Sequence, residues 1–492
     1  MAQPLVSAEQ ARNLDVRAIN ELGLSDLGLM EEASALMAEQ VIHLCAEKGW
    51  KKLVLLCGAG NNGGDGWTMA PLLKKANLEV LVLAVSSDQC SDLNQRQREK
   101  ALQQGIVVQE WPIEAINSWL VPIKDCDGVI DGFFGTGLTR SLTKPWKDLF
   151  TEIANLQKPT LAIDVPSGLN VDRGYPVGGC LPAEYTLSVY PRKLGFYLDE
   201  GPSLCGEIFD IKIYPESLLE GLPYQLMDKE DVLPFLPVKK NNANKTQFGK
   251  VAIVAGSKKM LGAAHLSLLS AYRSGASYVY WVSDLEQLPP LDEAVRLSFA
   301  DFYKKLNEFS AILIGPGLNE EEVDISGVLN QVSQAQIPKV VVDAAALTFL
   351  SEVHALPSSW VVTPHTGELA RLLKRAGDEV IKDRPLATLM ACKSFGCMVV
   401  TKGFYTVFGK HEELNVIPYG NVALAKAGSG DVLAGLIVGL MGQGLSSEQA
   451  SLLAVTLHGL AAELWVRLGN HVNAMAASDL LDLIPKVMAS KN

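Results

Sequence analysis

Short apolar runs alternate with longer amphipathic stretches along most of this chain, and the alternation predicts its elements. Residues 8–22 and 29–48 have the hydrophobic spacing of helices, and a third helix is expected over residues 67–75. Apolar runs of strand length lie at residues 52–57, 79–85, 128–131 and 160–163. Buried strands that alternate with helices are typical of a mostly parallel sheet with helices on both faces.

The pattern changes between about residues 213 and 250 and then starts again. Four prolines break any helix or central strand in this stretch: Pro215, Pro223, Pro234 and Pro237. A polar run, KKNNANK at residues 239–245, follows them. We therefore expect a domain boundary near Leu222, with one domain over residues 1–222 and a second over residues 223–492.

Six further apolar runs of strand length follow the boundary, and almost every one leads into an unusual loop. The runs are residues 251–255, 277–282, 311–314, 339–342, 360–363 and 397–401. Ligands of open α/β sheets bind in the crevice at the carboxyl ends of the strands. One pocket built from these loops is therefore expected in the second domain.

The composition limits the partners of the chain. Its 492 residues are 48% hydrophobic and 20% charged, which excludes wholesale disorder and allows two or three domains. The 43 Lys and Arg against 55 Asp and Glu give a net charge of −12, which disfavours nucleic acid and anionic membranes as partners. Any phosphate group must then be held locally, by backbone amides or by an ion.

Cysteine spacing and the apolar stretches predict where the protein works. The eight cysteines form no C-x-x-C pair, which is typical of reduced thiols in the cytosol. Residues 1–21 lack the apolar segment of a signal peptide, and the most apolar stretch, residues 432–441, is too short to span a bilayer. We expect a soluble, cytoplasmic protein.

A glycine-rich turn, GAGNNGGDG at residues 58–66, follows the first predicted strand. Its glycines let the backbone approach a ligand and expose amide groups at a helix N-terminus, and it fits the G-x-G-x-x-G dinucleotide-binding pattern. Asn61, Asn62 and Asp65 add side-chain oxygens of the kind that hold cations. No Lys-Ser/Thr pair follows the glycines, so a P-loop is excluded.

Two later strands end in an aspartate that precedes a tight loop. The first loop reads DGFFGTG from Asp131 to Gly137, and the second reads DVPSG from Asp164 to Gly168. Each aspartate alone is equally well explained as a turn residue or a helix cap. Their meaning therefore depends on the glycine-rich turn that precedes them.

The three motifs, in this order, resemble the NAD(P)H-hydrate epimerase family, also called the YjeF N-terminal domain, over about residues 5–215. The resemblance implies a Rossmann-like fold and interconversion of the R and S epimers of hydrated NADH or NADPH. It implies these substrate-binding residues: Asn61, Asn62, Gly63, Gly64, Asp65, Gly135, Thr136, Gly137, Leu138, Thr139, Arg140, Ser141 and Asp164.

The same resemblance implies a potassium ion held by Asn62, Asp131 and Ser167. Asp164 is our choice for the acid–base residue, because a carboxylate can exchange protons with the hydroxyl group that epimerisation removes and restores. One departure is Glu32, which stands where family members usually have asparagine.

A second candidate site begins at AGSGD, residues 427–431, which leads into the apolar helix expected over residues 432–441. Small residues at a helix N-terminus present free amide groups, and the helix dipole adds partial positive charge there. The amides of residues 428–431 can thus form an anion hole for a transferring phosphoryl group. Asp431 beside them is either the base that accepts a hydroxyl proton or a simple helix cap.

Together with the loops GPG at 315–317, TPHTGE at 363–368 and TKGFYT at 401–406, this segment resembles the ADP-dependent NAD(P)H-hydrate dehydratase family over about residues 224–485. The resemblance implies a ribokinase-like fold and phosphorylation of the hydrate hydroxyl by ADP, followed by loss of phosphate. It places Ala263, Gly317, His365 and Asp431 at the hydrate, and Lys402, Gly403, Phe404, Tyr405, Thr406 and Gly430 at the nucleotide. Asp431 would be the general base.

This half also departs from the family. The loop AGSKKMLGAA carries Lys258 and Lys259 where relatives usually have small residues, and Ser429 replaces the usual threonine. His265, His354, His411, His458 and His471 show no ligand spacing, and we assign them no role.

We therefore predict an α/β protein with an N-terminal Rossmann-like and a C-terminal ribokinase-like αβα domain, acting as a bifunctional metabolite-repair enzyme. The resemblance implies K⁺ at the epimerase site, ADP as co-substrate, Mg²⁺ for the dehydratase and a homo-oligomer. Two alternatives are a ribokinase-like small-molecule kinase fused to a Rossmann domain, and a nucleotide-sensing module without turnover. Asp164 and Asp431 argue against the sensor, because a pure binder needs no proton acceptor.

Overall fold

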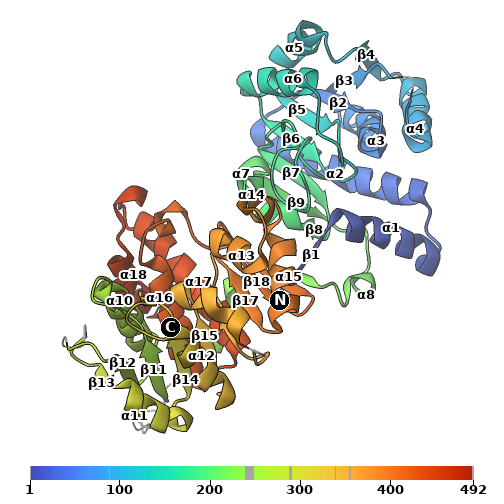
Figure 1. The fold of residues 1–492 in the computed structure, drawn as a ribbon. Helices are drawn as coiled ribbons and strands as arrows, with labels where there is room; N and C mark the ends of the chain where they lie inside the picture. Colours follow the sequence, from blue (N-terminus) through green and yellow to red (C-terminus); the bar gives the residue numbers. More distant parts are fainter. Residues whose placement is uncertain are drawn as a thin grey trace. The chain divides into compact units, whose positions relative to one another are not determined.

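The structure is a computed structural model, and it describes residues 2–87, 89–238, 249–286, 291–337, 339–353 and 356–489. It divides into two compact units, Pro4–Leu222 and Pro223–Asn492 with Met1–Gln3 (Figure 1). The polar run at 239–245 and His354, both singled out in the sequence, lie outside the described residues.

The N-terminal unit is built on a parallel sheet with the strand order β4-β3-β2-β5-β6-β7-β9. The strands are β2 (Lys52–Cys57), β3 (Glu79–Val85), β4 (Val107–Trp111), β5 (Gly128–Gly132), β6 (Thr160–Ile163), β7 (Tyr185–Val189) and β9 (Glu207–Ile211). The order reverses between β2 and β5, which is the switch point where doubly wound sheets bind ligands. A short strand, β1 (Gln3–Val6), pairs with β8 (Arg192–Lys193).

Helices cover both faces of this sheet, so the unit has three layers. They are α1 (Ala8–Leu22), α2 (Asp26–Lys48), α3 (Asn61–Lys75), α4 (Asp92–Gln103), α5 (Ile116–Lys124), α6 (Lys144–Asn155), and the short α7 (Gly201–Leu204) and α8 (Glu216–Leu219). Alternation along β2 sends Leu55 into the core beneath α2 and α3, with Trp67. Val54 points the other way, into a core with Trp119 and Phe150 of α5 and α6. The predicted Rossmann-like layering is confirmed.

The helix predicted to begin at Trp67 begins six residues earlier, at Asn61. Much of the glycine-rich segment, expected as a turn, is therefore the first turns of α3. The reason is close packing, since Gly63, Gly64 and Gly66 are buried where the helix approaches its neighbours. Likewise α2 begins at Asp26, not Leu29, because the Ser25 hydroxyl caps it by accepting from the Gly28 amide at 3.0 Å.

The C-terminal unit contains a larger mixed sheet with the order β13-β12-β11-β14-β15-β16-β17-β18-β19-β10. The strands are β10 (Tyr224–Leu226), β11 (Lys250–Val254), β12 (Tyr278–Val282), β13 (Val295–Leu297), β14 (Ala311–Ile314), β15 (Val340–Val342), β16 (Val361–Val362), β17 (Met398–Thr401), β18 (Thr406–Lys410) and β19 (Glu413–Ile417). All six predicted strands are present. The strands β13-β12-β11-β14-β15-β16-β17, in this spatial order, are parallel to their neighbours. Strand β18 runs antiparallel to β17 and β19, which the apolar runs did not predict.

Helices again lie on both faces of the sheet, and the predicted αβα architecture is confirmed. They are α9 (Lys229–Val232), α10 (Leu261–Arg273), α11 (Phe299–Lys304), α12 (Ile325–Gln334), α13 (Thr366–Leu373), α14 (Gly377–Lys382), α15 (Arg384–Phe395), α16 (Ser429–Gly442), α17 (Ser447–Arg467) and α18 (Ala477–Ala489). Ile253 packs with the helices α10, α16, α17 and α18, whereas Val254 packs with α12, α13 and α15. Helix α17 is long and apolar enough to cross a membrane by length and composition alone, but 72% of its most apolar stretch is buried, which is the pattern of a core helix.

Candidate functional site

The glycine-rich segment is fixed by a buried asparagine of α4. Asn94 donates from Nδ2 to the carbonyl oxygens of Gly58, at 2.9 Å, and Gly60, at 2.7 Å. Gly60 is the N-cap of α3 and has no side chain to cap it, so the first amides of the helix remain available to a ligand. Sequence reasoning missed Asn94, because nothing near it in the chain marks it as a partner of residues 58–60.

The close fit at Gly63 gives a first prediction. A Cβ atom at Gly63 would lie 2.0 Å from the Gly58 carbonyl oxygen, which the backbone cannot avoid without moving. We expect Gly63→Ala to lower the free energy of unfolding of the N-terminal unit by about 1–3 kcal/mol, as in other overpacked sites. Gly60→Ala is the matched control, because a Cβ there meets nothing within 4 Å. Urea unfolding of the full chain measures both, and equal stability of the two variants would contradict the prediction.

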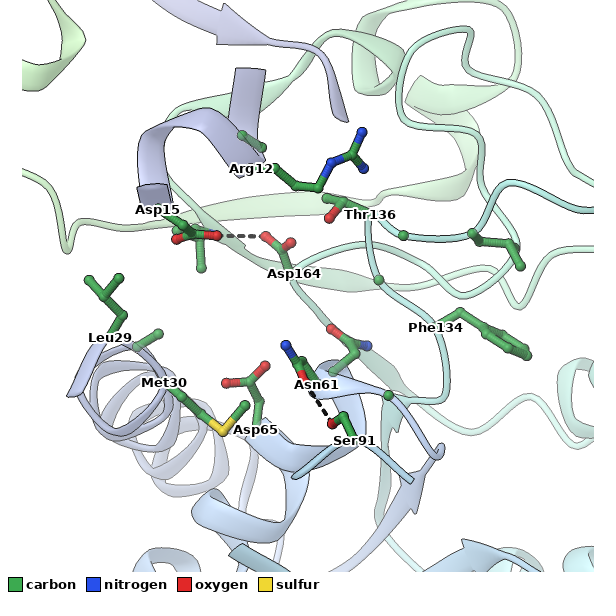
Figure 2. Close-up of a pocket in the computed structure, with 18 of the residues that line it drawn as sticks. Arg12, Asp15, Leu29, Met30, Asn61, Asp65, Ser91, Phe134, Thr136 and Asp164 are labelled. Carbon is green, nitrogen blue, oxygen red and sulfur yellow. Dashed lines mark hydrogen bonds between the residues drawn. The ribbon is translucent and has the colours of Figure 1, made fainter. Parts of the chain in front are cut away.

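A cavity of about 880 Å³ opens beside this segment, within the N-terminal unit (Figure 2). Ten of the predicted residues line it: Asn61, Asn62, Asp65, Gly135, Thr136, Gly137, Leu138, Thr139, Arg140 and Asp164. Gly63 and Gly64 are buried within α3, and Ser141 lies beside Gly178, so these three are outside the lining. The exposed Glu32, the departure noted in the sequence, also lies outside it.

The three predicted potassium ligands gather around the loop that follows β5. The buried Asp131 accepts from the Ser167 hydroxyl at 2.6 Å and from the Ser167 amide at 2.8 Å. Asn62 packs directly on Gly135, and its amide nitrogen has no hydrogen-bond partner among the described residues. Burial raises the pKa of Asp131 to about 6. One carboxylate among neutral oxygens suits a hard monovalent cation, which would favour the ionised form of Asp131.

Asp164 projects into the same cavity from the end of β6. Its backbone is left-handed, with φ of 60°, a conformation that aspartate tolerates better than most residues. The carboxylate accepts from the Val189 amide at 3.0 Å and forms an ion pair with Lys193. Lys193 is only 2% exposed and also donates to the Val189 carbonyl oxygen at 2.8 Å. A fixed carboxylate at the cavity wall is the arrangement that proton exchange with a ligand requires.

Two further acidic groups share this cavity. Burial raises the pKa of Asp65 to about 8, although the Ser34 hydroxyl, 3.0 Å from Oδ1, opposes the shift. Asp65 is therefore largely protonated at neutral pH and can donate a hydrogen bond to a ligand oxygen. Asp15 of α1 is the second acid, and it accepts a hydrogen bond from Tyr214. Sequence reasoning found neither Asp15 nor Lys193, since each lies in a short or ordinary element without a local motif.

In the C-terminal unit, the predicted anion hole is the N-terminus of α16. Its N-cap, Gly428, is left-handed with φ of 92°, and the Ser429 hydroxyl donates to the Leu424 carbonyl oxygen at 2.8 Å. Behind it, the His458 ring nitrogen Nε2 lies 3.1 Å from the Ser429 carbonyl oxygen. Burial lowers the pKa of His458 to about 4, so this histidine is neutral and donates to the carbonyl. The sequence assigned His458 no role, and the structure makes it a support of the loop.

Asp431 and Lys402, both predicted site residues, lie in one charged cluster. The Lys402 ammonium group is 2.9 Å from Asp343 Oδ1 and 3.8 Å from Glu368 Oε2. A Cβ atom at Gly430 would lie 3.3 Å from that ammonium nitrogen, so the lysine contacts the first turn of α16. Burial and Asp343 raise the pKa of Asp431 to about 6, while Lys402 lowers it. Burial alone would lower the pKa of Lys402, but Asp343 and Glu368 raise it.

The remaining predicted loops meet at the same end of the sheet. The Lys402 amide donates to the Pro364 carbonyl oxygen at 2.9 Å, which joins the TKGFYT loop to the TPHTGE loop. His365 caps α13, with its Nδ1 accepting from the Gly367 amide at 3.0 Å, and leaves its ring 53% exposed. Ser267 in the middle of α10 donates to the Asp431 carbonyl oxygen at 3.2 Å and so holds α10 against the N-terminus of α16.

Contacts of the smaller predicted residues complete this arrangement. A Cβ atom at Gly317 would lie 2.7 Å from the Ala263 side chain, so these two predicted hydrate contacts are neighbours. The rings of Phe404 and Tyr405 stack with centroids 4.4 Å apart, just before Thr406 at the start of β18. The buried Arg384, which sequence reasoning missed, donates to the Phe404 carbonyl oxygen at 2.8 Å and so supports that loop.

Each unit thus carries an aspartate at a carboxyl-end site of an αβα fold, which defines a two-domain α/β enzyme. Residues 26–195 match the family model of the YjeF-related protein N-terminus, and residues 251–486 match that of NAD(P)H-hydrate dehydratase. A bifunctional NAD(P)H-hydrate repair enzyme of Salinibacter ruber is 32% identical, over 100% of this chain and 97% of its own. The chain belongs to the family of bifunctional NAD(P)H-hydrate repair enzymes, as both resemblances in the sequence predicted.

Other relatives carry the same name. The Escherichia coli bifunctional NAD(P)H-hydrate repair enzyme is 30% identical, over 98% of this chain and 93% of its own. A crystal structure of ADP/ATP-dependent NAD(P)H-hydrate dehydratase from Bacillus subtilis, co-crystallized with ATP and Mg²⁺, is also 30% identical. It covers 54% of this chain and 98% of its own, with a TM-score of 0.47. These matches support the repair-enzyme family, and they do not give better support to the alternative of a small-molecule kinase fused to a Rossmann domain.

Proposed function

We propose that the N-terminal unit interconverts the R and S epimers of NAD(P)H hydrates and that the C-terminal unit dehydrates the S epimer to NAD(P)H. The second reaction uses ADP and gives AMP and phosphate. The observation that carries the proposal is the pairing, in one chain, of two sites that each bring an aspartate to the carboxyl end of a parallel sheet. The two reactions fit together, because the epimerase supplies the epimer that the dehydratase consumes.

In the proposed epimerase, the substrate occupies the 880 Å³ cavity. The amides at the start of α3 and the loop from Gly135 to Arg140 would receive its phosphates and ribose, in keeping with a chain whose net charge is −12. Asp164 exchanges protons with the hydroxyl group on the hydrated carbon. Gly63, Gly64 and Ser141 lie outside the cavity lining and would act through the shape of these two loops.

Asn62, Asp131 and Ser167 would hold K⁺ under this cavity. The ion would supply a positive charge that offsets the phosphates of a dinucleotide. The buried, oxygen-lined position of Asp131 supports this assignment.

In the proposed dehydratase, Asp431 takes the proton of the hydrate hydroxyl as that oxygen attacks the terminal phosphorus of ADP. The amides of residues 428–431 stabilise the charge that develops on the transferring group. Loss of the phosphate then restores the double bond of the ring. Ala263, Gly317 and His365 would shape the hydrate subsite, and Lys402, Gly403, Phe404, Tyr405, Thr406 and Gly430 would contact the nucleotide.

Mg²⁺ is expected to enter this site with the nucleotide. Over the part of the chain that the structure describes, no group of three or more His, Cys, Asp or Glu side chains could hold a metal ion. Mg²⁺ in such enzymes is bound through few protein ligands, with waters and substrate phosphates completing its shell. We also propose a cytoplasmic homo-oligomer, and the eight free cysteines are consistent with a reducing compartment.

The test of both activities uses the full-length chain with hydrated NADH. With ADP or ATP present, the absorbance of reduced nicotinamide should return for both epimers, and without nucleotide the epimers should interconvert without that return. If no NADH returns from either epimer with either nucleotide, the dehydratase assignment is wrong. If the separated epimers do not interconvert faster than they do without protein, the epimerase assignment is wrong.

The pKa of Asp431 predicts the pH dependence of dehydration. A general base must be ionised, so kcat/KM should fall below a pH of about 6, where Asp431 becomes protonated. Asp343 raises this pKa, so Asp343→Asn should move the acidic limb of the profile to lower pH. The measurement is kcat/KM on the S-hydrate between pH 4.5 and 8. Saturating substrate is not required, because kcat/KM reports the pKa values of the free enzyme. An unmoved or upward-shifted limb in the variant would contradict the assignment of the limb to Asp431.

A further inference from the structure

Asp15 lies in the same cavity as Asp164 but comes from a different part of the fold. It lies in the middle of α1, whereas Asp164 follows β6, and Figure 2 shows the two carboxyl groups directed toward one another. The hydroxyl group of Tyr214, just beyond β9, donates to Asp15 Oδ1 at 2.5 Å. None of the roles proposed above uses Asp15 or Tyr214.

The hydrogen bond between Tyr214 and Asp15 is one of several contacts that hold α1 in place. Other contacts also anchor this helix, since the Ala8 amide at its start donates to Asp172 at 2.6 Å and Arg17, farther along the helix, donates to the Leu218 carbonyl oxygen at 2.9 Å. Leu14 and Ala18 of the same helix are buried in an apolar cluster. Asp15 therefore presents a carboxyl group to the cavity, while other residues of α1 also hold the helix in place.

The two carboxyl groups have different surroundings. Asp164 is ion-paired with Lys193, whereas the hydrogen-bond partner of Asp15 is the neutral hydroxyl of Tyr214. Burial raises the pKa of Asp15, the negative charges of Asp164 and Asp26 add to the rise, and Tyr214 and Lys193 oppose it. Two carboxyl groups in one site with such unequal surroundings are suited to opposite roles, one as acid and one as base.

Epimerisation of a hydrate needs both roles. Water adds to the double bond of a dihydronicotinamide ring at the carbon beside the ring nitrogen, and inversion there requires water to leave one face and to add to the other. Departure of the hydroxyl group requires a proton donor, and addition of water requires a proton acceptor. One carboxyl group on one side of the ring cannot serve both faces at once.

We propose that Asp15 is a second catalytic residue of the epimerase, the proton donor to the departing hydroxyl group, with Tyr214 as its positioning residue. This inference rests on the proposed epimerase function and names a residue that the sequence motifs do not contain. It assigns the opposite role, that of proton acceptor, to the carboxylate of Asp164.

The step balances without any oxidant or reductant. The carboxylic acid of Asp15 gives its proton to the hydroxyl oxygen, the C–O bond breaks, water leaves, and the lone pair of the ring nitrogen forms a C=N bond. Water then adds to the other face of that carbon, the π electrons of the C=N bond return to nitrogen, and Asp164 takes a proton from the added water. A proton passes from Asp164 to Asp15 through solvent, which restores the starting state.

The test follows epimerisation of R-hydrate by the full-length chain without nucleotide, with the two epimers separated by chromatography. Asp15→Asn keeps an oxygen for Tyr214 but cannot donate the carboxylic proton, so kcat should fall by about 10²–10⁴-fold with little change in the unfolding midpoint. Arg17→Met is the matched control, because it removes a contact of the same helix outside the cavity and should leave kcat unchanged.

The pH profile separates catalysis from packing. A proton donor gives a falling limb at high pH, and Tyr214→Phe should move that limb upward, because the hydrogen bond from Tyr214 lowers the pKa of Asp15. A limb that stays in place, or an Asp15→Asn enzyme as fast as the unmodified chain, would overturn the inference. If Asp15→Asn does not fold, the shift in Tyr214→Phe decides. If the unmodified chain itself does not epimerise, the proposed function fails instead.

Discussion

Asp431→Ala should lower the rate of ADP-dependent dehydration by about 10²–10⁴-fold and leave epimerisation unchanged. The substitution removes the proposed acceptor of the hydroxyl proton, while the amides of α16 that are proposed to form the anion hole remain. Because Asp431 belongs to a different compact unit from the epimerase cavity, the first reaction should not respond. The two rates are measured on one protein sample, by return of reduced nicotinamide and by chromatography of the epimers.

A matched control for this variant is Asp378→Ala. Asp378 is also an aspartate in the first turn of a helix of the same unit, but it is exposed and belongs to α14. The Asp378→Ala variant should dehydrate the S-hydrate at the rate of the unmodified chain. If Asp431→Ala retained that rate as well, Asp431 would have no catalytic role. If the folded variant lost both reactions, the assignment of one reaction to each unit would be wrong.

Asp164→Asn should have the complementary effect and stop epimerisation while dehydration of the S epimer continues. Supplied with both epimers and ADP, the variant should return NADH only from the S epimer and leave the R epimer behind. Asparagine also tolerates the left-handed backbone at this position, so the change does not strain the backbone. The amount of R epimer left after the reaction ends is the measurement.

A second variant separates the loss of catalysis from the loss of the ion pair between Asp164 and the buried Lys193. Removing the carboxylate leaves the Lys193 ammonium group buried without its ion pair, which typically costs about 3–5 kcal/mol. The double variant Asp164→Asn with Lys193→Met removes both charges and should recover part of that stability without recovering epimerisation. If the double variant epimerised at the unmodified rate, Asp164 would not be the acid–base residue.

Local patterns in the sequence predicted most of the framework. Apolar runs identified six strands of the C-terminal unit, because parallel strands buried on both faces are continuously apolar. The glycine-rich segment was located but assigned to a turn, since glycine has a poor intrinsic helix propensity. Packing of α3 against its neighbours overrides that propensity and makes the segment helical from Asn61.

The parts of the sites that sequence did not predict are contacts between distant residues. Asp15, Lys193 and Tyr214 lie up to 199 positions apart, and each is an ordinary residue in its own element. Only the pairing of strands and the docking of α1 bring them to one cavity. In the second unit, the ion pair of Lys402 with Asp343 joins the ends of β17 and β15, and the two residues are 59 positions apart in the sequence.

The neutral His458 behind the start of α16 also determines how the dehydratase responds to acid. Its pKa of about 4 lies below that of Asp431, about 6, so mild acidification protonates the aspartate before the histidine. The loop proposed to carry the anion hole therefore keeps its support from His458 while Asp431, the proposed base, becomes protonated. Dehydration should therefore be lost on mild acidification and return when the pH is restored.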